Sequence, residues 1–258
     1  MELIDTHTHL FLEEFNDDRG QIIKEAQGKG INRFFLPNID SGSIDSVMKL
    51  SKEFPGICYP MIGLHPTSVK ENYIEELDLV VEYLKNDKFY GIGETGIDLY
   101  WDKTFITQQE EAFRFQIELA KQNALPIIIH VRDSFDEVFE IVDKLNGNNL
   151  NGIFHCFSGN YEQAQKIIGY GGFKLGIGGV VTFKNSGLAE IVSKIGLEHL
   201  VLETDSPYLA PVPYRGKRNK SSYLIEIATK IAEVKGISIE EVAMRTTENA
   251  KEVFKLFK

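Results

Sequence analysis

Short apolar runs alternate with longer amphipathic stretches along the whole chain. Eight runs stand out: Leu3–Asp5, Arg33–Leu36, Cys58–Gly63, Phe89–Gly93, Pro126–Ile129, Gly152–Phe154, Gly172–Ile177 and Leu200–Leu202. Runs of this length that are rich in Ile, Val, Leu and Phe are typical of parallel strands buried on both faces. We therefore expect eight buried parallel strands.

Helical spacing of apolar residues fills the intervals between these runs. The clearest case is Thr107–Gln122, where Phe113, Ile117 and Ala120 recur on one face. Further helices are expected over Glu75–Lys85, Asp136–Leu145 and Tyr161–Ile168, and after Ser238, which has Glu241 three residues on as in a capping box. The alternation predicts an α/β fold, a TIM (β/α)₈ barrel, as one domain over residues 1–258. An open doubly wound sheet is the alternative, because strand count does not show closure.

Residues that commonly bind metal ions or transfer protons fall at or just after the ends of the runs. They are His7, His9, His65, Glu94, His130, His155 and Asp205. The carboxyl ends of all strands in such a barrel surround one mouth, so we expect these side chains to converge there. The sixth histidine, His199, precedes its run and is expected to be structural.

The types and spacing of these residues predict a hydrolytic metal site. His7 and His9 lie two positions apart on a strand, so both imidazoles can reach one ion. Glu94 can bridge two ions through its two oxygens. Asp205 can bind metal and also accept a proton from a water molecule.

Two more histidines, His130 and His155, offer nitrogen ligands for a second ion. The complete donor set is nitrogen and oxygen, which suits two divalent ions such as Mg²⁺, Mn²⁺ or Zn²⁺. His65 remains open between a hydrogen-bonding support and a substrate contact. Cys156 adjoins His155, but strand alternation predicts that its thiol points away into the core.

Composition limits the class of protein. The chain has 28 basic and 38 acidic residues, and this net charge of −10 argues against coating of nucleic acid through bulk charge. No apolar run is long enough for a membrane span, the first residues lack a signal-peptide pattern, and two cysteines suit a reducing compartment. We expect a cytoplasmic protein without membrane association or an obligate protein partner.

One cationic loop differs from this acidic background. Residues 213–220 carry four positive charges in eight positions, shortly after the eighth run. Loops after the last two strands commonly bind phosphate in barrels of this kind. We predict that Arg215 and Arg218 clamp a phosphate, that Asn219 adds a neutral donor, and that Arg132 reaches the same mouth. This charge pattern favours a substrate that carries phosphate groups.

Seven short motifs occur in order: Asp5-Thr-His-Thr-His-Leu10, Gly63-Leu-His-Pro66, Gly93-Glu-Thr-Gly-Ile-Asp98, Leu125-Pro-Ile-Ile-Ile-His-Val-Arg132, His155-Cys-Phe-Ser-Gly159, Glu203-Thr-Asp-Ser-Pro-Tyr-Leu209 and Arg215-Gly-Lys-Arg-Asn219. Over nearly the whole chain they resemble the TatD family of metal-dependent deoxyribonucleases, within the wider amidohydrolase-like barrel superfamily.

The resemblance implies a TIM barrel with two metal ions, one held by His7, His9 and Asp205 and the other by His130 and His155, with Glu94 bridging. It also implies hydrolysis of phosphodiester bonds, commonly by removal of nucleotides from the 3′ end of DNA, with Mg²⁺ as the usual activator. The expected substrate is therefore DNA, single-stranded or at its 3′ ends.

Other functions remain open from the sequence. Relatives in the superfamily hydrolyse small cyclic amides or lactones, although they often bridge their metals with a modified lysine where this chain has Glu94. A metal-holding scaffold that binds nucleic acid without cutting it is a third possibility. Trp101, Tyr208 and Tyr214 either stack on bases or serve as packing.

Overall fold

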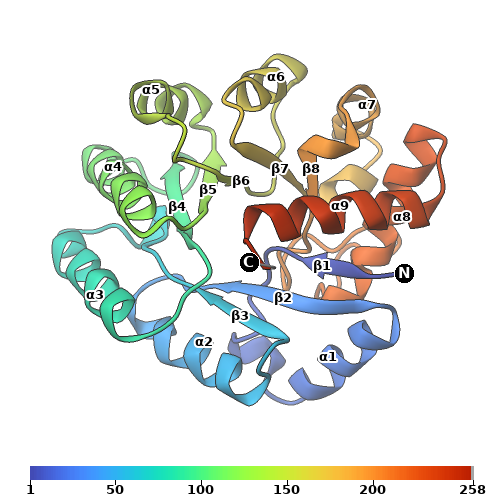
Figure 1. Cartoon of the computed structure of the whole chain (residues 1–258), viewed down its shortest axis with the longest axis horizontal. Coiled ribbons are helices and arrows are strands. Elements are labelled where there is room, and N and C mark those ends of the chain that lie inside the picture. The colour runs from blue at the N-terminus through green and yellow to red at the C-terminus, as the bar shows by residue number, and fades with distance from the viewer. Residues whose placement is uncertain (257–258) are drawn as a thin grey trace.

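The computed structural model describes residues 1–256, in which the strands form a ring surrounded by helices (Figure 1). The strands are β1 (Leu3–Asp5), β2 (Ile31–Pro37), β3 (Cys58–Met61), β4 (Ile92–Asp98), β5 (Ile127–Arg132), β6 (Gly152–Phe154), β7 (Phe173–Ile177) and β8 (Leu200–Leu202). All paired neighbours run parallel. Each predicted run overlaps one strand, as expected for parallel strands whose two faces are both buried, here by the helices outside the ring and by the side chains inside it.

Closure of the ring is visible in the backbone hydrogen bonds. The strands pair in chain order as two groups, β1–β3 and β4–β8. At one seam the N–H of Tyr90 donates to the carbonyl of Pro60 at 2.9 Å, and at the other the N–H of Thr6 donates to the carbonyl of Leu202 at 3.0 Å. The TIM (β/α)₈ class is confirmed, and the open-sheet alternative is wrong.

Helices follow the strands and form the outer layer (Figure 1). They are α1 (Arg19–Gly28), α2 (Ser41–Glu53), α3 (Tyr73–Asn86), α4 (Ile106–Asn123), α5 (Phe135–Leu145), α6 (Tyr161–Gly169), α7 (Leu188–Lys194), α8 (Leu224–Lys235) and α9 (Ile239–Val253). The four internal helices predicted from the sequence match α3 to α6 within two residues at each end, and Ser238 caps α9 by accepting from the N–H of Glu241 at 3.2 Å. Across residues 1–256, no helix is both long enough and apolar enough to cross a membrane.

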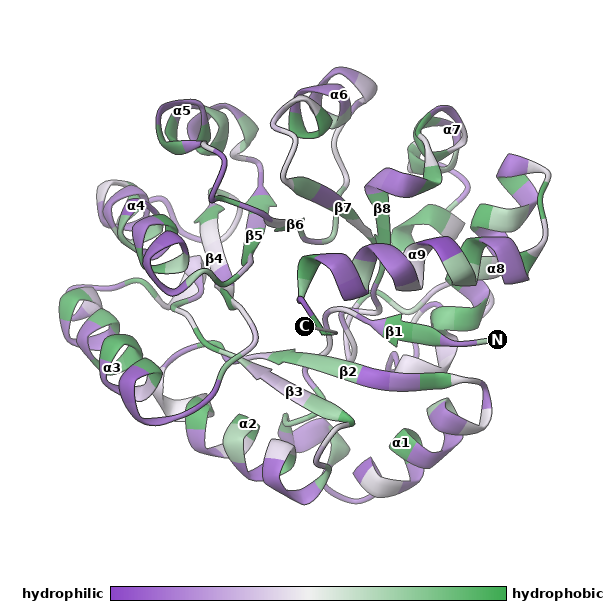
Figure 2. Ribbon diagram, viewed as in Figure 1, coloured by the Kyte–Doolittle hydropathy of each residue, from purple (hydrophilic) through white to green (hydrophobic). Residues whose placement is uncertain are grey.

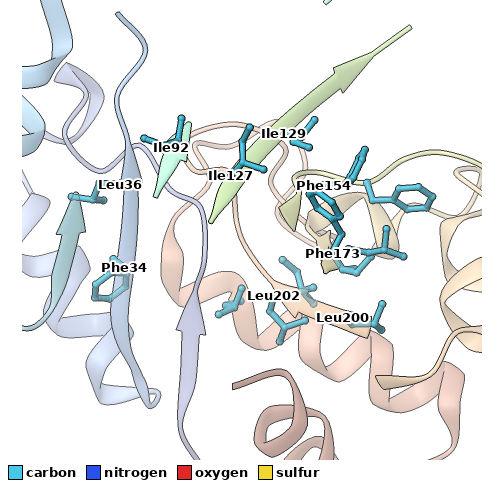
Figure 3. Close-up of a cluster of buried hydrophobic side chains, with 14 of the residues drawn as sticks. Phe34, Leu36, Ile92, Ile127, Ile129, Phe154, Phe173, Leu200 and Leu202 are labelled. Atoms are coloured by element: carbon cyan, nitrogen blue, oxygen red, sulfur yellow. The ribbon is translucent and has the colours of Figure 1, made fainter. Parts of the chain in front are cut away.

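Apolar side chains of the strands pack in two directions. On β5, Ile127 and Ile129 join the layer between strands and helices (Figure 3), whereas Ile128 belongs to a separate cluster inside the ring. This alternation follows from the two-residue period of a strand. Hydrophobic residues accordingly dominate most strands, while the helices mix both kinds along their length (Figure 2).

Helix α9 lies across the amino-terminal end of the ring (Figure 1). Phe254, just after α9, stacks on Phe35 of β2 with ring centroids 3.6 Å apart. The side chain of Asn249 donates to the carbonyl of Leu200 at the start of β8, at 2.7 Å, and the hydroxyl of Thr247 donates to the carbonyl of residue 2, just before β1, at 3.0 Å. A binding cavity is therefore left to the opposite end, where the strands finish.

Strands β4 and β5 run further than the hydrophobic pattern predicted. Glu94 and His130 consequently lie inside strands rather than at their ends. The hydrophobic pattern ended early because both strands continue through residues that are not apolar, namely Glu94, Thr95 and Gly96 of β4 and His130 and Arg132 of β5. A Cβ at Gly96 would lie 2.1 Å from the carbonyl oxygen of His130, so glycine permits the close approach of these two strands.

Candidate metal centre

A cavity of about 730 Å³ opens at the carboxyl ends of the strands. This volume is in the range of sites that bind small molecules. Six of the seven residues expected to converge line it: His9, His65, Glu94, His130, His155 and Asp205. The seventh, His7, is fully buried behind them, with its Nε2 3.0 Å from Glu94 Oε2.

Glu94 is buried at the centre of the cluster, and its two carboxylate oxygens face different histidines. Oε2 lies 3.0 Å from Nε2 of His7 and 3.9 Å from Nε2 of His9. Oε1 lies 2.6 Å from Nδ1 of His130 and 3.3 Å from Nε2 of His65. The two oxygens of this one carboxylate thus divide the surrounding histidines, which are candidate metal ligands (here called donors), into two groups. A carboxylate that bridges two metal ions needs this arrangement.

The first group is assembled where β1 and β8 end. The Nε2 atoms of His7 and His9 are 3.3 Å apart, and Asp205 Oδ1 is 3.3 Å from that of His9. The N–H of Asp205 donates to the carbonyl of His7 at 2.9 Å. Buried Asp5 accepts from the N–H and the hydroxyl of Thr204 at 2.9 and 2.6 Å. These bonds fix the end of β1 against the β8 loop, so the donors keep their spacing.

The second group gathers around Oε1 of Glu94. Nε2 of His155 lies 3.7 Å from this oxygen and 3.8 Å from Asp205 Oδ1. Nδ1 of His65 accepts from the N–H of Thr67 at 3.1 Å, which leaves Nε2 directed at Glu94. The sequence left the role of His65 open. Because its Nδ1 accepts a hydrogen bond, its Nε2 carries the ring hydrogen and points it at Oε1 of Glu94, which makes His65 a hydrogen-bonding support of that carboxylate.

The spacings suit coordination of cations. Four donors that each lie about 2.1 Å from one ion at tetrahedral angles are about 3.4 Å apart. The separations in the first group run from 3.0 to 3.9 Å. Within residues 1–256, the buried Nδ1 atoms of His7 and His9 have no hydrogen-bond partner, and the Nε2 atoms of the two rings converge at 3.3 Å beside Glu94 and Asp205. The residues present fit bound divalent metal ions.

Two further carboxylates support the histidines, and the sequence interpretation gave neither a role. Asp98 Oδ2 lies 2.9 Å from Nε2 of His130, and Glu203 Oε1 lies 2.9 Å from Nδ1 of His155. Gly176 of β7 makes room for Glu203, because a Cβ there would lie 2.2 Å from Oε2 of that side chain. Carboxylates of this kind orient metal-binding histidines and raise their basicity. A usable signal existed, since each belongs to a motif that also contains a predicted ligand.

The charged groups of the cluster shift one another's pKa values. Burial opposes ionisation of His155, but Glu203 and Glu94 beside it raise the pKa of this imidazole to about 10. Burial also works against the charge of Glu94, yet the surrounding histidines hold its pKa well below the usual range. His7 differs, because burial and then the charge of His155 lower its pKa to about 4. In the metal-free centre His7 is therefore neutral beside ionised Glu94, whereas His155 carries a proton that a bound metal ion would displace.

Known proteins share this arrangement of chain and fold. A profile of the family described as TatD related DNase matches residues 4–255. The chain belongs to this family. It is 40% identical to the uncharacterized metal-dependent hydrolase YabD of Bacillus subtilis, covering 98% of this chain and 99% of the relative. It is 29% identical to the uncharacterized metal-dependent hydrolase YcfH of Escherichia coli, covering 98% and 96%.

Solved structures of TatD proteins have the same barrel. The structure of YJJV, a TatD homolog from Escherichia coli K12, matches with a TM-score of 0.89 at 26% identity and covers 98% of each chain. A TatD family hydrolase from Entamoeba histolytica matches with a TM-score of 0.84 at 22% identity, also over 98% of each chain.

Of the four residues predicted to bind phosphate in this TatD protein, one lines the cavity and the other three are placed elsewhere. Arg132 lines the cavity. Arg215 is exposed, and Arg218 is paired with Asp18 at 2.5 Å. Asn219 is fully buried and donates its amide to two backbone carbonyls of the β8 loop at 2.7 and 2.6 Å. Its side chain therefore holds the loop instead of facing the cavity.

Cys156 also departs from expectation, because it lines the cavity next to Asp205. Alternation predicted that it points into the core. Strand β6 ends at Phe154, however, and Cys156 has a positive φ of 46°. The two-residue period of the strand therefore does not extend to this position.

Proposed function

We propose that this TatD protein hydrolyses phosphodiester bonds of DNA with two divalent metal ions, as an exonuclease that removes nucleotides from the 3′ end. The observation that carries the proposal is the division of the donors by the two oxygens of Glu94. In the proposed centre His7, His9 and Asp205 would hold the first ion, His130 and His155 would hold the second, and Glu94 would be shared.

Ions in such a centre polarise a phosphoryl oxygen and activate water as the nucleophile, and Mg²⁺, Mn²⁺ and Zn²⁺ all suit these donors. Asp205 supplies the base. Burial raises its pKa, but the hydrogen bond from His9 and the nearby charge of His155 outweigh this, so its pKa lies below the ordinary value. The carboxylate is therefore ionised at neutral pH and can accept the proton of the attacking water.

Two cationic side chains would contact an anionic substrate: Arg132, which lines the cavity, and Arg215, which is exposed on the loop after β8 with its guanidinium carbon 4.3 Å from the ring centroid of Phe183. Within residues 1–256, no carboxylate forms an ion pair with Arg132 or Arg215, so their donors are available to phosphate oxygens. Arg218 is committed to Asp18 instead. This distribution favours a phosphodiester over a neutral cyclic amide or lactone.

A time course on a 5′-labelled single-stranded DNA oligonucleotide tests the proposal, with Mg²⁺, Mn²⁺ or EDTA. We expect a ladder that shortens from the 3′ end with metal and an intact strand in EDTA. Asp205→Ala should abolish the ladder without unfolding the chain, whereas Asp78→Ala, an exposed change on α3, should not. An intact oligonucleotide with folded, metal-loaded protein would overturn the proposal and favour hydrolysis of small amides or lactones.

A further inference from the structure

Two large aromatic side chains stand exposed on the loop after β4. Tyr100 and Trp101 follow β4 directly and are 55% and 68% exposed. Trp101 lines the same cavity as the candidate metal ligands. A third exposed aromatic, Tyr208 of the β8 loop, also lines the cavity, where its ring lies edge-on to His9 at a centroid distance of 6.0 Å. Tyr214 is not comparable, because its ring is stacked on Tyr223 at a centroid distance of 3.9 Å. Because 68% of Trp101 is exposed beside the cavity, much of its ring surface is not used by protein packing.

Hydrogen bonds hold the backbone that carries the two rings, although the rings themselves are not buried. Oδ1 of Asp98 accepts from the N–H of Tyr100 at 3.0 Å and from the N–H of Trp101 at 3.1 Å. Further along the loop, Asp102 pairs with Lys70 of the preceding β/α loop at 3.1 Å. The loop is therefore fixed at both ends, and the exposure of Trp101 belongs to a preorganised surface.

A cation completes this surface. The guanidinium carbon of Arg132 lies 3.9 Å from the ring centroid of Tyr100 and 5.3 Å from that of Trp101. The two rings are perpendicular, with centroids 5.0 Å apart. A stacked guanidinium keeps its N–H donors in the plane, where they can bind phosphate oxygens. An open aromatic face next to such donors matches a nucleotide, which presents a flat base beside a phosphate.

We propose that Trp101, together with Tyr100 and Arg132, is a platform on which one unpaired base of the substrate stacks beside the phosphodiester that is cut. The inference rests on the proposed function and specifies the form of its substrate. A base inside a duplex has both faces covered, so the platform selects single strands and frayed ends. Stacking uses the face that all bases share, so little sequence preference is expected.

Fluorescence tests the platform without any catalysis, because Trp101 is the single tryptophan of the chain. We expect a five-residue oligothymidylate, added in EDTA, to quench the emission in a saturable manner. A matched strand of the same length with a stable abasic residue at every position carries the phosphates without the bases and should leave the emission almost unchanged. Equal responses to the two strands, including no response to either, would overturn the platform.

Variants test the same surface during turnover. Trp101→Ala should raise KM for a single-stranded oligonucleotide roughly tenfold with little change in kcat, and should reduce the preference for single strands over blunt duplexes. Trp101→Phe should restore most of the affinity, since it keeps a ring. Phe115→Ala is the matched control, because this aromatic on α4 is also exposed but does not line the cavity. Wild-type KM and strand preference in Trp101→Ala would overturn the proposal.

The two proposals fail in different ways. Metal-dependent cleavage of DNA with base-independent emission of Trp101 removes the platform and leaves the nuclease. Quenching by the base-containing strand alone, without cleavage of any phosphodiester, supports the platform and removes the nuclease.

Discussion

Asp98 holds His130 through the ring nitrogen that Glu94 does not use. Oδ2 of Asp98 lies 2.9 Å from Nε2 of His130, while Nδ1 lies 2.6 Å from Oε1 of Glu94. The other oxygen of Asp98 accepts from the backbone of Trp101. A single carboxylate thus sets the orientation of a candidate ligand and the position of the proposed stacking platform.

Asp98→Asn keeps the shape of this side chain and removes its charge. Because His130 loses its carboxylate partner, we expect metal affinity and kcat/KM to fall by about 10- to 100-fold. Calorimetric titration with Mn²⁺ and a parallel rate measurement check this. Asp102→Asn is the control, since it lies on the same loop and pairs with Lys70 instead. Equal metal affinity in the two variants would contradict the role given to Asp98.

Gly176→Ala should disturb the candidate metal centre indirectly, through Glu203 and His155. The new methyl group would lie 2.2 Å from Oε2 of Glu203, so this carboxylate must move away from His155. We expect weaker metal binding and at least roughly tenfold lower activity, by the same loss of histidine support. Gly178→Ala, where the nearest atom is 3.7 Å from the added Cβ, should behave like the parent protein. Identical activities of both variants would show that Glu203 has no influence on His155.

Alanine substitutions of the two arginines in the cationic loop should have different effects on KM. Arg215→Ala removes a cation without a carboxylate partner in residues 1–256, so KM for an oligonucleotide should rise and its salt dependence should become less steep. Arg218→Ala breaks the exposed pair with Asp18, which contributes about 0–1 kcal/mol to stability, and should leave KM unchanged. Rates measured over a range of salt concentrations distinguish the two. A larger KM effect at Arg218 than at Arg215 would reverse the assignment.

Helix α9 and Phe254, which cover the amino-terminal end of the ring, should contribute to the stability of the protein and not to its catalytic activity. Phe254 is 4% exposed and stacks on Phe35, so Phe254→Ala should lower the free energy of unfolding by about 3–5 kcal/mol. Urea denaturation measures the loss. Activity per folded molecule, assayed well below the transition, should stay at the parent value because the cavity lies at the opposite end. A selective loss of activity in folded Phe254→Ala would contradict this separation.

Cys58 should be unreactive in the native protein. Burial, followed by the charge of Glu53, raises the pKa of this thiol to about 12. The thiolate is the reactive form, so at pH 8 almost none is available, and reactivity should rise only as the pH approaches 12. Colorimetric thiol titration of a Cys156→Ser variant should detect no fast-reacting group before urea is added and one per chain afterwards. Rapid labelling of the native variant at pH 8 would contradict the burial of Cys58.

Part of the candidate site was predictable because its signals are local. The two-residue spacing of His7 and His9 after an apolar run identifies them as candidate metal ligands, and the position of Asp205 after the eighth run identifies this residue in the same way. Asn219 could not be read in this way. Its residue type and its charged neighbours suggest a phosphate contact, while its burial depends on backbone carbonyls that the chain brings back to it.

The amino-acid sequence by itself determined the alternation of strands and helices and the identity of the candidate metal ligands, because periodicity and residue type act over a few neighbouring positions. Closure of the strands into a ring needed the tertiary structure. Only the tertiary structure decided which oxygen of Glu94 each histidine faces, that His65 directs its Nε2 at this carboxylate, and that Arg218 is paired with Asp18. These relationships join side chains from different strands and loops. Their distances are set by the closed ring and the packing around it, which no local pattern encodes.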